Sequence, residues 1–314
     1  MIRYVLKRIL LMIPILLGIT LIVAVFIEIA PGDPAKIKLG SDATPEELQA
    51  FRDEYGLDDP FIVKYFRFIG NAIRGDFGRS FYNNRPVITE ILQRFKYTLM
   101  TSCLSVTLAV LVGIPLGIFA ATHQYTLWDN AAVTCSLAFV SMPAFFFALL
   151  LVRFFGLHLK ILPLSGVSSW KGWILPVISL SFGFTATITR QMRSNMLEVI
   201  RQDYITTARA KGQSEFKIRY IHALKNAIIP IITVVGGIFG MALGGAMIAE
   251  VIFSIPGLGS YTISGLTGRD YPVVQGSTLF MSAIFSIVML LIDLLFSFID
   301  PRIRSQFVRS KRSR

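Results

Sequence analysis

The chain has 314 residues, of which 54% are hydrophobic and only 16% are charged, and it carries a formal net charge of +12. Soluble domains carry about 25% charged residues, so this composition excludes a single soluble domain, and the hydrophobicity excludes a disordered chain. A basic excess is typical either of nucleic-acid binding or of a membrane protein with cationic loops, and the mean hydropathy of +0.62 favours the membrane protein. The two cysteines, Cys103 and Cys135, provide neither a disulfide framework nor a metal site.

Six apolar stretches are long enough for helices that cross a hydrocarbon core, which needs about 20 residues. The first follows three basic residues but is too long for the apolar part of a signal peptide, so we expect a retained transmembrane helix. The fourth is the shortest, and we expect its helix to continue past Arg190. We therefore predict an all-α, polytopic membrane protein with six transmembrane helices, over Ile9–Ala30, Leu99–Ala121, Ala131–Phe155, Trp173–Thr189, Ala227–Ile252 and Gly276–Ile299.

The basic residues predict the orientation of these helices. Seventeen Lys and Arg lie before the first stretch, between the fourth and fifth, and after the sixth, whereas the short loops of the opposite side hold Lys160, Lys171 and Arg269. Basic residues are enriched in cytoplasmic loops, so we expect both termini and the 190–225 loop to be cytoplasmic. The long 31–98 region, with ten basic and ten acidic residues, is then external.

These spans divide the sequence into four expected parts. Residues 1–30 form the N-terminal transmembrane helix, and 31–98 form the external loop region. Residues 99–300 form a core of five helices, which includes a cytoplasmic loop at about 190–226, and 301–314 form a basic cytoplasmic tail.

Glycines recur in the fifth apolar stretch. Gly236, Gly240 and Gly244 are spaced four residues apart, and small residues at this spacing let helix backbones approach closely. The pattern is compatible with tight packing alone and with a helix that lines a wide translocation pathway.

The cytoplasmic loop contains the sequence Asp-Tyr-Ile-Thr-Thr-Ala-Arg-Ala-Lys-Gly over 203–212. We expect Asp203 to cap a two-turn helix, Gly212 to end it in a left-handed conformation, and Ser214 to cap a second helix that ends near Asn226. A short helix held between two spans suits docking of another protein, although a basic solvated loop that only sets topology has the same composition.

Other membrane classes have little support in the sequence. A secondary transporter would show carboxylates near the middle of its spans and inverted repeats, whereas Glu250 and Asp293 lie near span ends. A membrane enzyme would need a constellation such as H-E-x-x-H or G-x-S-x-G, and the three histidines are far apart. The chain also lacks a G-x-x-x-x-G-K-[ST] loop for binding ATP phosphates.

The cytoplasmic loop resembles the coupling loop of ABC-importer permeases. Ala208-Arg-Ala-Lys-Gly212, followed by Pro230, is similar to the "EAA" signature, although Thr206 and Thr207 replace its Glu and first Ala. More narrowly, the whole chain resembles the B-type subunit of the dipeptide/oligopeptide/nickel permease family. That resemblance rests on Pro31-Gly-Asp-Pro34, Tyr55-Gly-Leu-Asp-Asp-Pro60, Gly75-Asp-Phe-Gly78 with Ser80, Ser141-Met-Pro143, Phe253-Ser-Ile-Pro-Gly-Leu-Gly259, Arg269-Asp-Tyr-Pro-Val-Val-Gln-Gly276 and Asp300-Pro-Arg-Ile-Arg304.

The resemblance implies a type I ABC-importer permease fold and a set of partners. This chain would form half of a pore with a C-type permease, two cytoplasmic ATPases would bind ATP and Mg, and an external binding protein would deliver substrate. The chain itself would be non-catalytic and would hold no cofactor or metal. It would couple to an ATPase through Asp203, Tyr204, Thr207, Ala208, Arg209, Ala210, Lys211 and Gly212, with Ala208 and Ala210 allowing close approach and Arg209 and Lys211 pairing with acidic groups.

In the external regions, the same resemblance singles out Asp33, Asp76, Arg269 and Asp270. It implies a bacterial inner-membrane location. Its substrate would be a di- or oligopeptide or a glutathione-like tripeptide, with nickel or a metal chelate as the alternative. The short loop from about Gly156 to Gly172 is similar to the loops of glutathione-type and nickel-type members.

Overall fold

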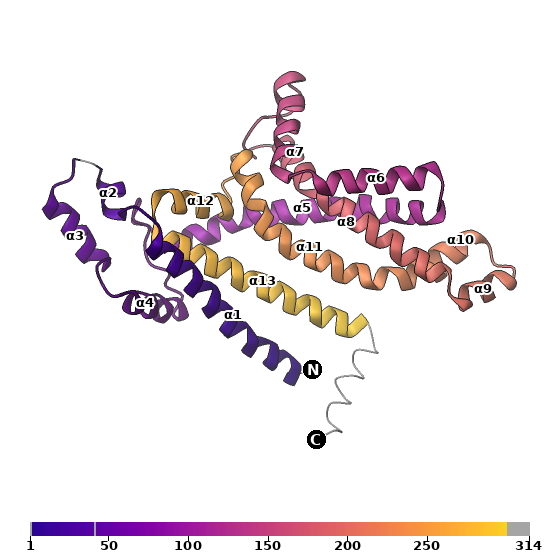
Figure 1. Ribbon diagram of the computed structural model, residues 1–314, viewed down its shortest axis with the longest axis horizontal. Helices are drawn as coiled ribbons and strands as arrows, with labels where there is room; N and C mark the ends of the chain where they lie inside the picture. Colours follow the sequence, from indigo (N-terminus) through magenta and orange to yellow (C-terminus); the bar gives the residue numbers. More distant parts are fainter. Residues whose placement is uncertain (1, 41, 300–314) are drawn as a thin grey trace. The chain divides into compact units, whose positions relative to one another are not determined.

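A computed structural model describes residues 2–40 and 42–299 (Figure 1). Within these residues the chain is helical and contains no β-strand, although Arg79 and Pro86 form an isolated bridge. The chain divides into two compact units. The first comprises residues 1–99 and 254–287, and the second comprises 100–253 and the chain from 288 onward. The expected tail over 301–314 lies outside the described residues.

Five helices are long and apolar enough to cross a membrane by themselves. The candidate spans are Val5–Ile29, Val87–Thr122, Trp170–Ile200, Glu215–Gly244 and Tyr271–Leu295, and the third and fourth begin in short helical segments that lead into the long helix. The expected continuation of the fourth stretch past Arg190 is confirmed. The helices themselves are α1 (Ile2–Ile29), α5 (Val87–Thr122), α8 (Ile174–Ile200), α11 (Leu224–Ile252) and α13 (Tyr271–Ile299).

The third apolar stretch was wrongly expected to form one uninterrupted helix over Ala131–Phe155. It forms α6 (Leu127–Ser141) and α7 (Ala144–Leu151), and a π-helical segment over Val152–His158 extends α7. The chain bends by 100° between α6 and the helix that starts at Ala144. These two helices count as a sixth span only if they cross the membrane together. The break lies at Pro143, which has no N–H to donate. Met142 before it is extended (φ −82°, ψ 126°), as the residue before proline prefers.

The first unit contains most of the region expected to be an external loop, and that region is largely helical. It holds α2 (Pro34–Leu39), α3 (Pro45–Tyr55) and α4 (Phe61–Ile73), followed by turns at Gly75 and Gly78, and α12 (Leu258–Gly268) follows later in the chain. Thr44 and Glu47 form a capping box at the start of α3, and Gly56 ends it in the left-handed conformation. Because α5 begins at Val87, residues 87–98 belong to that helix.

The second unit has its own apolar core, formed mainly by α5, α8 and α11. Met192, Ile205, Ile218 and Ile231 are buried in it. Two glycines let α5 and α8 approach closely. A Cβ on Gly113 would lie 2.9 Å from the Cβ of Ile188, and one on Gly117 would lie 2.6 Å from the Cβ of Met192. This pair follows the small-residue spacing of close helix contacts.

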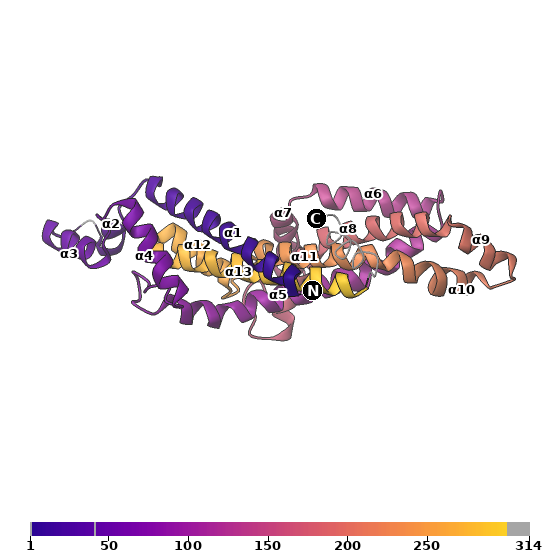
Figure 2. The ribbon, with the colours of Figure 1, turned by 90° about the horizontal axis from the view of Figure 1, so that it is seen from below.

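Figures 1 and 2 show α9 (Asp203–Ala210) and α10 (Glu215–Lys217) beyond the ends of α8 and α11, within the second unit. The helix that begins after Ser214 was wrongly expected to end near Asn226. It continues through a π-helical segment over Ile218–Ala223 directly into α11, which contains Pro230. The π-helical segment therefore joins α10 to α11 without a loop.

Candidate functional site

The short helix α9 is held against the second unit by one face. Ile205 is fully buried in the apolar core, where it lies with Met196 of α8 and Ile218 and Ala223 of the π-helical segment. Ala208, one turn later on the same face, is half-buried and packs against this core. The small side chain of Ala208 thus allows α9 to approach its own chain, while Ala210 is exposed.

The turn after α9 forms as expected at Gly212 and Ser214. Gly212 has φ +75°, in the left-handed region that favours glycine. The Ser214 hydroxyl accepts a hydrogen bond from the Lys217 N–H and so caps α10. The expected cap at Asp203 was wrong by one residue. Gln202 is the extended cap residue, and Asp203 is the first helical residue, where its charge favours the positive end of the helix.

Three side-chain contacts tie the two sides of this turn together. The Nε of Arg209 lies 2.7 Å from Glu215 Oε1, and Glu215 also lies near Arg219. The Nδ2 of Asn226 donates to the Tyr204 hydroxyl at 2.7 Å. His222 and Gln213 are also hydrogen-bonded through their side chains. Arg209 therefore already has an acidic partner in its own chain, whereas it was expected to pair with another protein.

The side of this turn that faces away from the core is exposed and carries both aromatic and polar side chains. Tyr204 is 43% exposed, Phe216 is 68% exposed, and the rings of Phe216 and Tyr220 lie 4.8 Å apart. Thr207 and Lys211 are also exposed. Exposed aromatic groups beside cations, on a turn that is fixed from behind, make a surface suited to contact with another protein.

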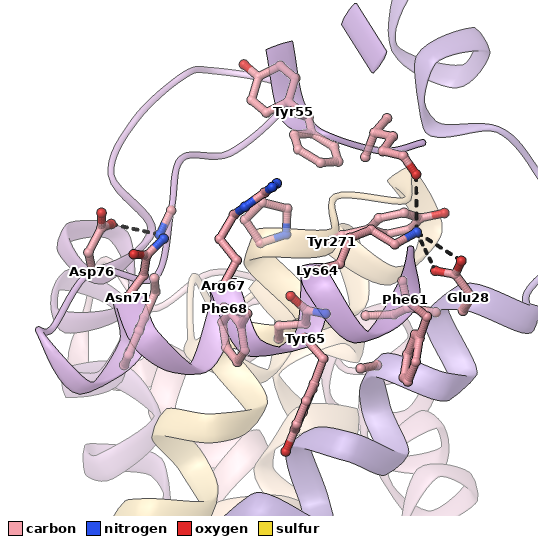
Figure 3. A pocket seen from close by; sticks show the side chains of 18 of the residues that line it. Glu28, Tyr55, Phe61, Lys64, Tyr65, Arg67, Phe68, Asn71, Asp76 and Tyr271 are labelled. Atoms are coloured by element: carbon pink, nitrogen blue, oxygen red, sulfur yellow. Dashed lines mark hydrogen bonds and ion pairs between the residues drawn. The ribbon is translucent and has the colours of Figure 1, made fainter. Parts of the chain in front are cut away.

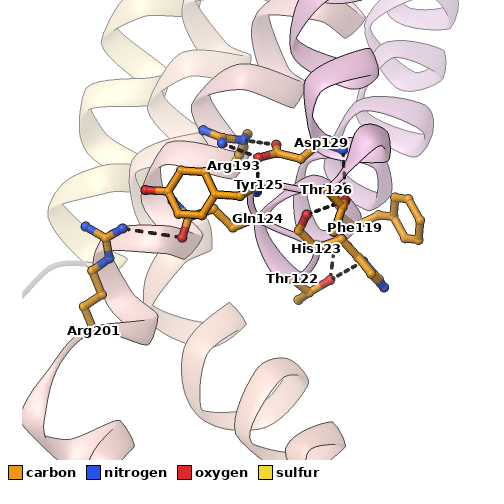
Figure 4. A network of polar contacts seen from close by, with 9 residues as sticks. All are labelled: Phe119, Thr122, His123, Gln124, Tyr125, Thr126, Asp129, Arg193 and Arg201. Atoms are coloured by element: carbon orange, nitrogen blue, oxygen red, sulfur yellow. Dashed lines mark hydrogen bonds and ion pairs between the residues drawn. The ribbon is translucent and has the colours of Figure 1, made fainter.

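An ion pair that sequence reasoning missed lies in the same unit (Figure 4). Asp129, at the start of α6, contacts Arg193 of α8 through both carboxylate oxygens, and Asp129 is only 2% exposed. Thr126 caps α6 by accepting the Asp129 N–H. The sequence Thr-Leu-Trp-Asp over 126–129 matches a capping pattern, so this signal for a helix start was available. The partner Arg193 was not evident.

The four residues expected in the external region all make structural contacts within the first unit. Asp33 caps α2 by accepting the Ala35 N–H and forms a 2.6 Å ion pair with Arg52 of α3. Asp76 accepts the Gly78 N–H at 2.9 Å and fixes the turn after α4. Hydrogen bonds to backbone N–H groups two residues further on explain both carboxylates.

Arg269 and Asp270 reach the same part of the first unit from a distant part of the chain. Arg269 donates to the Pro31 carbonyl oxygen, and Asp270 accepts the Ser80 hydroxyl at 2.6 Å and the Phe81 N–H at 3.2 Å. Four aromatic rings pack beside these contacts in a row. The centroids of neighbouring rings are 4.7 Å apart for Phe51 and Tyr55, 4.7 Å for Tyr55 and Phe81, and 6.0 Å for Phe81 and Tyr271. The motifs quoted from the sequence therefore form one structural cluster.

Burial perturbs the ionisable groups of this cluster. It raises the pKa of Asp270, and the hydrogen bonds from Ser80 and Phe81 oppose the rise only in part. Burial, followed by the charges of Asp270 and Glu90, raises the pKa of Tyr261 to about 12. Burial also acts to raise the pKa of Asp33, but the Arg52 guanidinium and the Ala35 N–H together hold it below its ordinary value.

A cavity of about 300 Å³ lies between α1, α4 and the start of α13 in the first unit (Figure 3). Aromatic side chains form much of its wall, and its cations are already paired. Lys64 lies 2.8 Å from Glu28, and Arg67 lies 2.6 Å from Asp59. With these charges satisfied inside the chain, the cavity has no free cation to select an anionic ligand.

The three glycines of α11 differ in their surroundings. A Cβ on Gly236 would lie 2.7 Å from Ile292 of α13, so Gly236 serves close packing. Gly240 is buried, whereas Gly244 is exposed and has nothing within 4 Å of its Cβ position. A close approach of two long helices occurs instead at Gly113 and Gly117 of α5, which face α8. Their G-x-x-x-G spacing was present in the sequence but was not singled out.

Among the described residues, no group of His, Cys, Asp and Glu could hold a metal ion. The contacts described above divide the site residues into two sets. One set fixes the turn around α9, and the other joins α2, α3 and α12 in the first unit. Other helices of the described chain, among them α1, α5 and α13, are long and apolar enough to span a membrane, so the fold and sites define a helical membrane protein with an exposed, braced turn.

Comparisons with known proteins identify the class. Residues 113–305 match the family described as the inner membrane component of binding-protein-dependent transport systems, and residues 1–102 match the N-terminal domain of such components. The chain belongs to this family. It is a multi-pass inner-membrane permease of an ABC importer.

The relatives it resembles are permeases. The chain is 38% identical to the glutathione transport system permease protein GsiC of Escherichia coli (strain K12), over 97% of this chain and 99% of the relative. It is 39% identical, with the same coverage, to GsiC of Salmonella paratyphi A. The inward-facing MetNI methionine ABC transporter is similar in fold, with a TM-score of 0.58 and 15% identity, covering 67% of this chain and 96% of the other.

Proposed function

We propose that this chain forms half of the translocation pathway for short peptides of the glutathione type. The observation that carries the proposal is its similarity to GsiC, which extends over 97% of this chain. Nickel, or a metal chelate, was the alternative from the sequence. The GsiC proteins of Escherichia coli and Salmonella paratyphi A are both named for glutathione transport, so they favour the peptide.

The proposed orientation places α9 and both ends of the chain in the cytoplasm. The unequal distribution of Lys and Arg supports it, since the 190–225 segment alone holds eight of them. The part of the first unit that holds α2, α3 and α4 then lies outside, where a binding protein delivers substrate.

In this assembly α9 docks on one of two ATPase subunits. Its buried residue Ile205 shares a core with α8 and α11, and the bond between Tyr204 and Asn226 ties α9 to the start of α11. Displacement of α9 by the ATPase would therefore move α8 and α11 with it, because close-packed elements transmit strain. Lys211 and Phe216 are exposed and available to the ATPase surface.

The chain itself would perform no chemical reaction. ATP and Mg would bind to the two ATPase subunits, and a C-type permease would supply the other half of the pathway. The family membership supports a set of partners of this kind.

The test measures ATP hydrolysis by the assembled complex of both permeases and both ATPases in liposomes. We expect binding protein loaded with glutathione to stimulate hydrolysis several-fold over unloaded binding protein. Stimulation by nickel-loaded binding protein and not by the glutathione-loaded form would instead support the metal alternative. ATP hydrolysis by this chain alone would contradict the non-catalytic role.

A further inference from the structure

One face of α4 is apolar and has no partner in the described chain. At 100° per residue, Ile62, Phe66 and Ile73 fall within one narrow sector of the helix. Their exposed fractions are 65%, 66% and 82%, and none of the residues of α4 is buried. Leaving large apolar side chains in water is unfavourable relative to burial, so this face needs an apolar neighbour.

The other sides of α4 are polar or packed. Lys64 is paired with Glu28 at the end of α1, and it also donates to the Leu57 carbonyl oxygen at 3.1 Å. Arg67 is paired with Asp59, and Asn71 is exposed on the same polar side. The helix therefore separates an apolar face from a charged face.

Contacts with α1 fix the depth of α4 relative to an apolar span. The Tyr65 hydroxyl donates to the Leu17 carbonyl oxygen at 2.9 Å and lies 3.3 Å from the Thr20 hydroxyl. Leu17 is twelve residues before Ile29, which is about 18 Å along a helix. The neighbouring Lys64 meets Glu28 at the end of the same span, so adjacent side chains of α4 reach both the end of the span and its apolar length (Figure 3).

The surface of α1 at this level is also apolar and exposed. Phe26 is 70% exposed and Ile29 is 74% exposed, and α1 is a candidate span of which only 11% is buried. The apolar face of α4 therefore lies on a helix packed against a span whose own exposed surface is apolar at the same end. Interfacial helices have this construction, with large apolar residues buried about 5–10 Å below the headgroups and cations on the opposite face.

We propose that α4 lies in the membrane interface, with Ile62, Phe66 and Ile73 among the acyl chains of the leaflet where α1 ends. The occupant of the face is the lipid bilayer. The first unit is then anchored to the membrane surface by α4 as well as by α1. This inference rests on the membrane location of the family and holds for peptide and metal substrates alike.

The test measures the accessibility of nitroxide labels in the full complex, reconstituted in vesicles of phosphatidylethanolamine and phosphatidylglycerol. Cys103 and Cys135 are first replaced by serine, and single cysteines are then introduced as Ile62→Cys, Phe66→Cys and Ile73→Cys. Asn71→Cys, on the polar side of α4, and Glu46→Cys, in exposed α3, are the matched controls. Retained ATPase activity of each labelled complex shows that it has assembled.

We expect molecular oxygen to relax the labels at the three apolar positions several-fold more than water-soluble nickel ethylenediaminediacetate does. The order should reverse at the two controls. Greater relaxation by the nickel complex at Phe66 would overturn the proposal and place this face in water. Low accessibility to both reagents at all three positions would also overturn it, because a protein partner would then cover the face. Neither readout depends on which substrate is transported.

Discussion

The Asp270 carboxylate accepts a 2.6 Å hydrogen bond from the Ser80 hydroxyl, although 190 residues separate the two in the sequence. Both residues are 2% exposed. The bond joins the turn that follows α4 to the segment between α12 and α13, and the Phe81 N–H reinforces it at 3.2 Å. It therefore closes the first unit, which is built from two distant parts of the chain.

Ser80→Ala should destabilise the first unit by about 1–3 kcal/mol, because it leaves a buried carboxylate oxygen without its donor. The measurement is the thermal unfolding midpoint of the solubilised complex. Ser168→Ala, at an exposed serine, is the control and should leave the midpoint unchanged. Equal midpoints for both variants would show that the Ser80 bond does not stabilise the unit.

Asp270→Asn should make the protein at least as stable as wild type at neutral pH. Burial raises the pKa of Asp270 above its ordinary 3.8, so the folded state favours the neutral acid. The stability contributed by this group is complete below pH 3.8 and is lost as the pH rises through the raised pKa. Asparagine stays neutral; its amide oxygen can accept the Phe81 N–H, and its NH2 group can donate to the Ser80 hydroxyl oxygen.

The measurement for Asp270→Asn is the unfolding midpoint of both proteins between about pH 4 and pH 8. The advantage of the variant should grow with pH and shrink towards acid. A variant that loses stability relative to wild type as the pH rises would contradict the assigned direction of the pKa.

Gly117→Ala should destabilise the second unit by about 1–3 kcal/mol, since overpacking forces close elements apart. The new Cβ would lie 2.6 Å from the Met192 Cβ and 2.7 Å from the Thr189 backbone oxygen. Gly183→Ala on α8 is the matched control, because nothing lies within 4 Å of its Cβ position. That variant should be neutral or slightly stabilised by helix propensity. Equal unfolding midpoints for both variants would refute close packing of α5 and α8.

Asp129→Ala and Arg193→Met should each destabilise the protein, because each leaves a charge without its partner in a largely buried place. The double variant should lose less than the summed losses of the single variants, with a coupling free energy of about 1–3 kcal/mol. Denaturant unfolding of the four proteins completes the cycle. If the two single losses of unfolding free energy simply add up in the double variant, the contact between Asp129 and Arg193 does not stabilise the protein.

Gly212→Val should reduce both transport and substrate-stimulated ATP hydrolysis several-fold, because a β-branched residue resists the left-handed conformation at φ +75°. Gly212→Asn is the matched control, since asparagine tolerates this conformation and is similar in size. Both should reach the membrane in normal amounts. Normal activity of Gly212→Val would remove the turn from the coupling account, and equal loss in both variants would assign the effect to a contact with the partner.

Local signals in the sequence predicted much of the turn around α9. Gly212 and Ser214 act where helix-capping chemistry places them, because caps depend on residues only a few positions away. The same locality explains the error of one residue at Asp203, since neighbouring polar residues compete for the cap position. The site assignments for contact with an ATPase stay predictions.

Contacts between distant residues could not be read from the sequence. Nothing local to Ser80 indicates Asp270, and nothing local to Asp129 indicates Arg193, because these pairs depend on how whole helices pack. The bend at Pro143 is a different case. Its proline was visible, but the apolar run on both sides gave the same hydropathy as one unbroken helix.

The most direct test of the proposed function is uptake of labelled glutathione into liposomes that enclose ATP. The vesicles carry both permeases and both ATPases, with the binding protein outside. We predict uptake that requires this chain, ATP and the binding protein together, and that Gly212→Val reduces while Gly212→Asn does not. Undiminished uptake without this chain, or transport by this chain alone, would contradict the account.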